Sequence, residues 1–420
     1  MARAQKKSFH IIYFFLQPFF TLLYYLKNFR KPEAKNVMWL FTIFFGFTFA
    51  IGKETQNSDI TRYIADIPLF HNLHLSFSGI LAYYYASPEI DILRISLAFI
   101  VSYFTANGFY LIIVYGVIYG FFYSRNMWYI LDRLKGRTKT FTRILIFCLF
   151  LIIPIWGLNG FRFWTGAHIF LFGLLPFLFE GKKKSLIWCF ITPFVVHYSF
   201  LAALVPLCIY LIFGNKIKLY YIFFIFSLFI SSINITQFNK LVDTYAPKSF
   251  AEKSAGYRGK ENVANFTSGK GRYNREKEVW YSKFFREIQK YTVAMFLLVF
   301  YWSFRKSLST DGELLRLLSF ILLFYAFANI LSSLPSGGRF VVVGNLLAFS
   351  FLTLHLQNNI VNRDLYRVAN IATPFLVVTI IISLRMSLYF LSLMSLIGNP
   401  ITAIFSFGDN ISLNDIIKGL

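Results

Sequence analysis

The chain contains few cysteines, and none in a pattern that would bind a metal. Its three cysteines, among 420 residues, lie inside apolar runs and show no C-x-x-C spacing (Cys148, Cys189 and Cys208). Such residues predict buried thiols and exclude a disulfide framework or a thiolate metal site. Walker, H-E-x-x-H, G-x-S-x-G and D-x-D patterns are also absent, which argues against nucleotide hydrolysis, a zinc protease and a metal-dependent sugar transferase. We therefore expect neither a metal nor a cofactor.

Acidic side chains are scarce as well. The 19 Asp and Glu face 42 Lys and Arg, a formal net charge of +23, which in a soluble protein would suggest nucleic acid as a partner. Here most basic residues fall in short loops between apolar runs, as the positive-inside rule expects for cytoplasmic loops. Membrane topology therefore accounts for much of the charge, and we expect no nucleic acid partner.

Apolar residues make up 57% of the chain and recur in runs from near the N-terminus almost to the end. Runs such as 144–156 and 340–354 are apolar on every face, which predicts membrane helices. The first run ends in a basic cluster instead of a small-residue cleavage site, so we expect it to stay with the protein. The sequence predicts a single all-α, polytopic membrane domain over residues 1–420.

The loops set the expected topology. Basic loops at 27–35, 125–143, 182–184, 216–218, 305–316 and 363–367 are assigned to the cytoplasm. Between the loops we expect spans near 37–51, 108–130, 144–156, 162–179, 185–197, 198–213, 219–233, 291–304, 315–332, 340–356 and 368–384. Residues 11–25 either cross or lie in the interface, which gives about 11–12 transmembrane helices. Gly398-Asn399-Pro400 breaks the last apolar stretch, and we expect the C-terminus on the outer face.

Two external segments are too long to be simple turns. Residues 52–107 mix polar and apolar side chains, and within them 92–103 is expected to form a helix that dips into the membrane. Residues 234–290 form the longest polar stretch and are expected to be an external loop, since long loops are partly exempt from the positive-inside rule.

Candidate site residues gather on the external side of this topology. Asp59, Arg62 and Tyr63 stand at positions i, i+3 and i+4, so on a helix they share one face. This patch is either a binding site or an interfacial anchor made of an ion pair and an aromatic residue.

Three further arginines lie on the same side of the predicted topology. Arg162 opens a span, Arg339 follows a glycine pair, and Arg94 follows Glu89 and Asp91. Each alone could be a snorkelling arginine. Together with Arg62 they favour a shared anionic partner, because such residues are costly on the side where short loops carry few cations. We infer a phosphate or pyrophosphate in the outer leaflet.

Two histidines are candidates for proton transfer. His197 sits between two short apolar segments, at an expected outer turn, and could act as a base near neutral pH. A hairpin-capping role is an equal alternative. His168, inside a span, is more typical of a satisfied residue of the helix bundle. Asp59 is the other candidate base.

These features resemble the EpsG/Wzy-type family of bacterial polysaccharide polymerases. The similarity lies in Gly52, Lys53 and the run from Ser58 to Tyr63, and in Glu89 before an apolar dip. It continues in Arg162 at the start of a span, in the Lys-Lys-Lys turn followed by His197-Tyr198-Ser199, and in the late Arg339.

The resemblance implies a GT-C-like glycosyltransferase of the bacterial cytoplasmic (inner) membrane. Such an enzyme joins undecaprenyl-diphosphate-linked oligosaccharide repeat units at the periplasmic face, with a chain-length regulator and a flippase as further partners. In this reading Asp59 or His197 is the catalytic base, and Arg62, Tyr63, Arg94, Arg162 and Arg339 bind substrate. Charge stabilisation by arginine needs no metal, and attack from the opposite face inverts the anomeric centre. A flippase of lipid-linked oligosaccharide, an O-antigen ligase and a membrane-bound O-acyltransferase remain alternatives.

Overall fold

The computed structural model describes residues 2–56, 58–74, 76–86, 91–229, 240, 244–245, 280–304, 312–334, 336–359 and 363–419. Within these residues the chain is helical and forms no strand, apart from one isolated bridge between Ser392 and Ser412. The helices, with short 3-10 turns labelled η, are α1 (Ala2–Leu16), α2 (Pro18–Lys27), α3 (Ala34–Phe47), η1 (Lys53–Thr55), α4 (Asp59–Asn72), α5 (Phe77–Ala86), α6 (Ile92–Phe104), α7 (Phe109–Leu131), α8 (Thr140–Ile152), η2 (Ile155–Gly160), α9 (Phe161–Glu180), η3 (Lys183–Leu186), α10 (Ile187–Val195), η4 (Tyr198–Phe200), α11 (Leu201–Phe213), α12 (Ile217–Phe229), α16 (Trp280–Phe304), α17 (Gly312–Leu331), α18 (Gly338–Asn358), α19 (Arg363–Ser387), α20 (Leu393–Ile397), α21 (Pro400–Phe405) and α22 (Leu413–Lys418).

The predicted spans coincide with helices. Each of the expected spans overlaps one observed helix, because apolar runs of this length favour helix locally. Four helical stretches are long and apolar enough to cross a bilayer: 140–180, which joins α8, η2 and α9, and the helices α17, α18 and α19. Shorter apolar helices cover 34–47, 92–104, 198–213 and 217–229. The all-helical class is confirmed, and the full number of spans stays a prediction.

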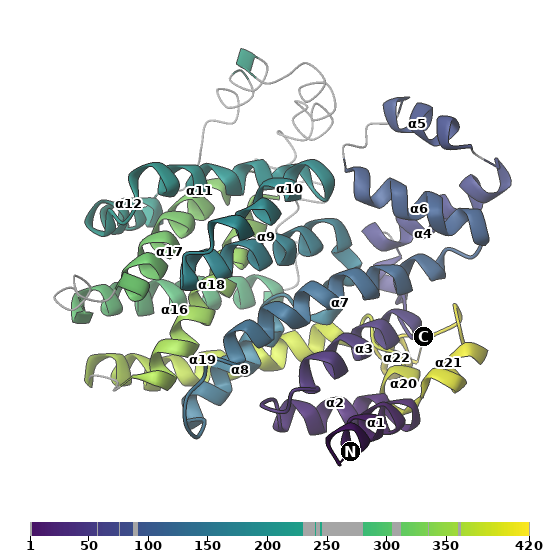
Figure 1. The fold of residues 1–420 in the computed structure, drawn as a ribbon, viewed down its shortest axis with the longest axis horizontal. Coiled ribbons are helices and arrows are strands. Elements are labelled where there is room, and N and C mark those ends of the chain that lie inside the picture. Colours follow the sequence, from purple (N-terminus) through teal and green to yellow (C-terminus); the bar gives the residue numbers. More distant parts are fainter. Residues whose placement is uncertain are drawn as a thin grey trace.

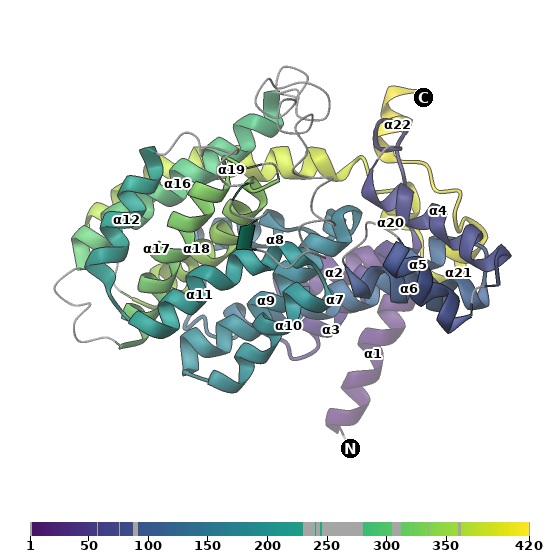
Figure 2. The same cartoon turned by 90° about the horizontal axis from the view of Figure 1, so that it is seen from above.

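The helices form an elongated body with α7, α8 and α9 near its middle. Figure 1 shows α11, α12 and α16–α19 on one side of these central helices, and α4–α6 together with the C-terminal helices on the other. The view from above in Figure 2 agrees, and it shows α1 projecting from the body. The segment 52–107, predicted to be external, therefore forms a group of its own, in which α4 packs on α6.

The chain turns back on itself after α9. The Cys189 thiol of α10 donates to the carbonyl of Phe170 in α9 at 3.2 Å, and the Ser185 hydroxyl donates to that of Gly173 at 2.6 Å. α10 therefore runs antiparallel to α9. The turn at 197–200 then lies level with the start of α9, and α11 runs back. The predicted position of His197 at a turn is confirmed.

The C-terminal stretch breaks where the sequence predicts. α20 ends at Ile397, and the Asn399 side chain caps α21, which begins at Pro400. Farther on, the Asp415 carboxylate of α22 accepts from the Lys53 amide at 3.0 Å, and Lys418 pairs with Glu54. The tail thus packs beside residues 53–54 of the segment predicted to be external, and the side of the membrane on which both lie stays a prediction.

The predicted loop 234–290 lies mostly outside the described residues. Its last part, from Trp280, is already helical and forms the start of α16. The helix therefore begins earlier than the expected span at 291–304, because polar residues at the end of a membrane helix can continue it into the interface.

Glycine allows α3 and α7 to pack closely. A Cβ atom on Gly116 of α7 would lie 2.8 Å from the carbonyl oxygen of Thr42, which is backbone and cannot rotate away. Small residues at such crossings let helix backbones approach each other in membranes. This contact fixes the position of α7, which supports the site described below.

We predict that Gly116→Ala destabilises the protein. Separating the two helices should cost roughly 1–3 kcal/mol, as for other overpacked interiors. The measurement is thermal unfolding of the purified protein in detergent. Gly312→Ala is the matched control, because a Cβ atom there meets no atom within 4 Å; equal unfolding temperatures for the two variants would contradict the prediction.

Candidate functional site

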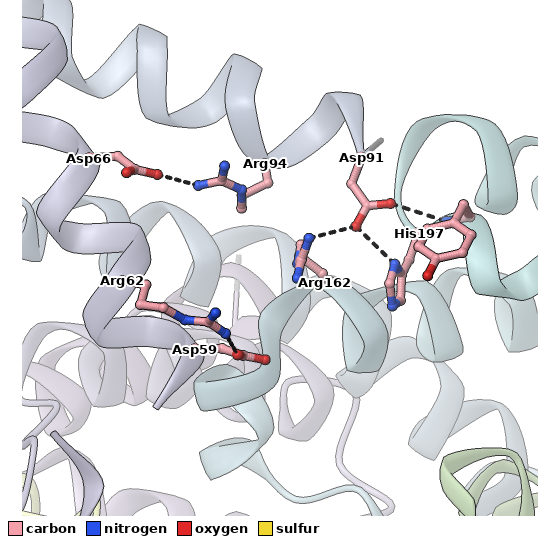
Figure 3. Close-up of polar contacts among 8 residues, drawn as sticks. Asp59, Arg62, Asp66, Asp91, Arg94, Arg162 and His197 are labelled. Carbon is pink, nitrogen blue, oxygen red and sulfur yellow. Dashed lines mark hydrogen bonds and ion pairs between the residues drawn. The ribbon is translucent and has the colours of Figure 1, made fainter. Parts of the chain in front are cut away.

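One buried carboxylate connects three segments of the chain. Asp91 precedes α6 but makes no capping hydrogen bond to its own helix, although aspartate commonly does so in that position. Instead it accepts from the Arg162 guanidinium at 3.1 Å and from the Tyr198 amide at 3.1 Å. Its Oδ2 also lies 2.9 Å from Nδ1 of His197. Figure 3 shows Arg162 and His197 converging on this side chain.

Charge compensation keeps Asp91 ionised. Only 1% of its side chain is exposed, and that burial by itself would raise the pKa of the carboxyl. His197, Arg162 and the Tyr198 amide outweigh the burial and hold the pKa of Asp91 below its ordinary value. A buried carboxylate is stable here because cationic and amide donors surround it.

A second ion pair lies beside the first. Arg94, in the first turn of α6, pairs with Asp66 of α4 at 2.5 Å, and only 3% of the arginine side chain is exposed. Since Asp91 and Arg94 are both at the start of α6, the two pairs hold the same end of that helix. They attach it to α4 on one side and to α9 on the other.

Tyr63 lies between the two arginines. Its ring centroid is 5.0 Å from the guanidinium carbon of Arg94 and 5.3 Å from that of Arg162, within the range of cation–π attraction. The ring is almost fully buried and meets Tyr115 of α7 edge-on. Tyr115 in turn stacks on Phe161 with centroids 3.6 Å apart. An aromatic layer from α4, α7 and α9 therefore supports the arginines.

The Tyr115 hydroxyl has no hydrogen-bond partner within the described part of the chain, although it is fully buried. Buried hydroxyls are normally satisfied, and one left over beneath a polar site can mark a position that water or a ligand completes.

Arg339 reaches the same region from α18. Its guanidinium carbon lies 5.5 Å from the Phe163 ring centroid, and that ring meets His197 edge-on at 5.7 Å. Phe163 also follows Arg162 directly in the chain. Its ring contacts Arg339 and His197, and its backbone is next to Arg162. Among the described residues no hydrogen bond or carboxylate satisfies the half-buried Arg339 side chain. It is therefore a cation available to a ligand.

The patch predicted at the start of α4 is divided in the structure. Tyr63 points inward, whereas Asp59 and Arg62 pair with each other near the surface, where 30% and 63% of their side chains are exposed. The interpretation as a surface ion pair fits these two residues. No contact joins Asp59 to His197 in the described structure. Glu89 lies outside the described residues.

The structure also corrects the argument from the four arginines. Arg62, Arg94 and Arg162 each have a carboxylate partner within the chain, respectively Asp59, Asp66 and Asp91. The cost of placing these arginines at the rim is therefore met internally. Of the four arginines, only Arg339, which lies near His197, still calls for an external anion as its partner.

Sequence reasoning did not assign Asp91 or Asp66 to the site. Asp91 was visible as part of a charged cluster with Glu89 and Arg94, but nothing local ranks one acid of such a cluster above another. Asp66 follows Arg62 by one helical turn, a spacing that predicts pairing between those two residues. Its actual partner, Arg94, depends on how α4 and α6 pack.

His168 is a residue of the interior, as predicted. It is fully buried, with its ring 5.2 Å from those of both Tyr119 and Tyr123. Asn126 donates to its backbone carbonyl at 2.7 Å. These contacts enclose the imidazole, so His168 is separate from the site around Asp91.

No family model, curated protein or solved structure matches the chain. The site must therefore be interpreted from its own geometry. Among the described residues it contains a histidine beside a buried carboxylate, an arginine with no anionic partner there, and an aromatic layer beneath them. Such an arrangement can bind an anion and remove a proton from a neighbouring hydroxyl.

Replacement of Asp91 should destabilise the protein strongly. Asp91→Asn leaves Arg162 buried without its counter-charge, which we expect to cost about 3–5 kcal/mol. The effect should not add to that of Arg162→Gln, since each substitution removes the other's partner. Unfolding of the single and double variants measures this coupling. Asp59→Asn, at an exposed pair, should cost at most about 1 kcal/mol, and an equal loss in the two asparagine variants would contradict the assignment.

The same carboxylate predicts a pH dependence. Because its folded pKa lies below the ordinary value of 3.8, the unfolded chain binds the proton more readily. The stabilisation from Asp91 is then complete above the ordinary pKa and is lost as the pH falls through the lower, folded pKa. We expect the stability difference between wild type and Asp91→Asn to shrink only in that acidic range. A difference that stays constant or grows as the pH falls below 5 would be inconsistent with a lowered pKa.

Proposed function

We propose that the protein is a membrane glycosyltransferase that polymerises undecaprenyl-diphosphate-linked oligosaccharide repeat units. The observation that carries the proposal is the convergence of Arg162, His197 and Arg339, from α9, the following turn and α18, around Asp91 and Phe163. These residues are among those that the resemblance to EpsG/Wzy-type polymerases assigns to the site. The proposal includes a multi-pass, GT-C-like arrangement in the bacterial inner membrane, with the site on the periplasmic face.

His197 is the better of the two candidate bases. Its Nδ1 lies 2.9 Å from Asp91, so the carboxylate positions the ring and leaves Nε2 as the atom that can accept a proton from a hydroxyl. Asp59 has its charge engaged by Arg62 at the surface. Asp91 itself accepts from Arg162 and from the Tyr198 amide, lies beside His197, and serves as a positioning residue.

Arg339 is suited to the diphosphate. Its planar guanidinium can bind phosphate oxygens with two parallel hydrogen bonds, and no carboxylate of the described residues would have to be displaced from it. Half-burial beside aromatic rings strengthens such an interaction compared with bulk water. As the glycosidic bond to the diphosphate breaks, negative charge grows on the leaving oxygen, where an arginine stabilises it.

The reaction step follows from these roles. A hydroxyl of the incoming lipid-linked unit loses its proton to Nε2 of His197, and its oxygen forms a bond to the anomeric carbon of the growing glycan. The bond from that carbon to the diphosphate oxygen breaks, and the lipid diphosphate departs with the electron pair. Attack opposite to the leaving group inverts the anomeric configuration.

A direct test is reconstitution with purified lipid-linked repeat units, followed by sizing of the products on a gel. Wild type should give a ladder spaced by one repeat. Arg339→Ala should reduce the ladder by at least about 100-fold, the scale found for loss of one charge-stabilising donor, while leaving the unfolding temperature unchanged. Arg339→Lys keeps the charge but loses the fork, and should be intermediate.

Arg367→Ala is the matched control, because Arg367 is exposed on α19 and lies 3.9 Å from Asp364. It should give the wild-type ladder. A wild-type ladder from Arg339→Ala would remove this residue from the mechanism. Movement of lipid across the bilayer without a ladder would favour a flippase, and transfer to lipid A core acceptors alone would favour an O-antigen ligase.

A further inference from the structure

A second polar region lies at the opposite end of α7 and α9. A cavity of about 210 Å³ opens there, and its lining includes Lys35, Arg125, Trp128, Asp132 and Arg133. Pro176 of α9 also lines it. Since Pro176 follows Arg162 by 14 residues of helix, the cavity is about 20 Å from the site around Asp91. By the predicted topology this end faces the cytoplasm.

Arg125 is the unusual residue of this cavity. It belongs to α7 and is half-buried, with its guanidinium carbon 4.6 Å from the Phe121 ring centroid and 5.1 Å from that of Trp39. Its hydrogen bonds go to the neutral side chains of Ser124 and Asn36, both at 2.9 Å. Within the described residues it has no carboxylate partner. A half-buried guanidinium in a membrane helix normally has an anion nearby.

The charges around the cavity do not cancel. Arg133 pairs with Glu180, and the exposed Asp132 can offset one further cation, which leaves either Lys35 or Arg125 in excess. Lys35 has no hydrogen bond or ion pair within the described structure. Lys35 lies at the start of α3, and Arg125 lies near the end of α7. A single small anion in the cavity could therefore contact a cation from each helix.

We propose that this cavity binds a phosphate group, carried by an anionic lipid headgroup or free in solution. Arginine supplies a planar fork and lysine a point charge, the usual pair for phosphate. Trp128, whose ring nitrogen donates to the carbonyl of Phe29 at 2.9 Å, forms an aromatic wall of the kind found at the headgroup level. Basic pockets between helices on the cytoplasmic side are suited to anionic headgroups.

Thermal unfolding of the full-length protein in detergent tests the proposal. The probes are dioctanoyl phosphatidylglycerol, dioctanoyl phosphatidylcholine and inorganic phosphate, each titrated. We expect phosphatidylglycerol to raise the unfolding temperature, and Lys35→Gln or Arg125→Gln to weaken its apparent affinity about fivefold, the effect of one cation near an anionic headgroup. Lys35→Gln is the cleaner variant, because among the described residues that side chain makes no hydrogen bond or ion pair that the substitution would break.

Lys27→Gln is the matched control, since Lys27 is exposed in the same basic segment and does not line the cavity. It should bind as wild type does. Binding of inorganic phosphate that is weakened by Lys35→Gln would support the site and identify free phosphate as its source. The proposal is overturned if both cavity variants bind like wild type, if phosphatidylcholine binds as well as phosphatidylglycerol, or if only Arg339→Ala removes binding.

Discussion

The architecture of the site depends on the burial of one carboxylate. An ionised group with only 1% of its side chain exposed is unstable unless donors surround it, and the donors of Asp91 come from α9 and from the turn after α10. The need for donors around Asp91 therefore constrains the start of α6, α9 and the turn after α10 together. It places the start of α6 against α9, and it holds His197 beside Arg162, although 35 positions separate them in the chain. Apolar side chains pack with little directional preference, whereas a buried carboxylate requires its donors at particular positions around it.

The helices were predictable from the sequence because their cause is local. Long apolar runs favour helix whatever their neighbours, so every expected span coincides with one, and Gly398-Asn399-Pro400 breaks the chain as predicted. The partners of the charged residues were not predictable, because they depend on packing between helices. The i, i+3 spacing correctly predicted the pairing of Asp59 with Arg62, but it could not show that Arg94 takes Asp66 or that Asp91 is shared.

The pairing of arginines with internal carboxylates changes what the site can bind. Three of the four arginines that suggested an anionic ligand are neutralised, and two of them, Arg94 and Arg162, build the framework that holds α4, α6 and α9 together. In the proposed function, ligand binding is then left to Arg339 and His197, which both contact the Phe163 ring. This division is chemically reasonable. In the proposed reaction, a framework of paired charges is already organised before substrate arrives, and Arg339, which no described carboxylate pairs, can respond to charge that develops on the leaving group.

The interior between the Asp91 site and the cavity lined by Lys35 and Arg125 helps to choose between glycosyl transfer and transport of lipid across the membrane. In the described structure, His168 is enclosed by Tyr119 and Tyr123, whose hydroxyls donate to the carbonyls of Pro154 at 2.6 Å and Phe150 at 2.9 Å. Beside these central helices, Tyr325 donates to Asn345 at 2.7 Å, and Asn345 donates to Gln289 at 3.2 Å. The hydroxyls of Tyr119, Tyr123 and Tyr325 and the Asn345 amide thus have partners inside the packed interior, whereas Nε2 of His168 has none among the described residues. A transporter needs polar groups that face a path between the leaflets. Groups already bonded to each other would have to break these contacts to serve a passing headgroup, so this arrangement favours chemistry at one face over passage between the two.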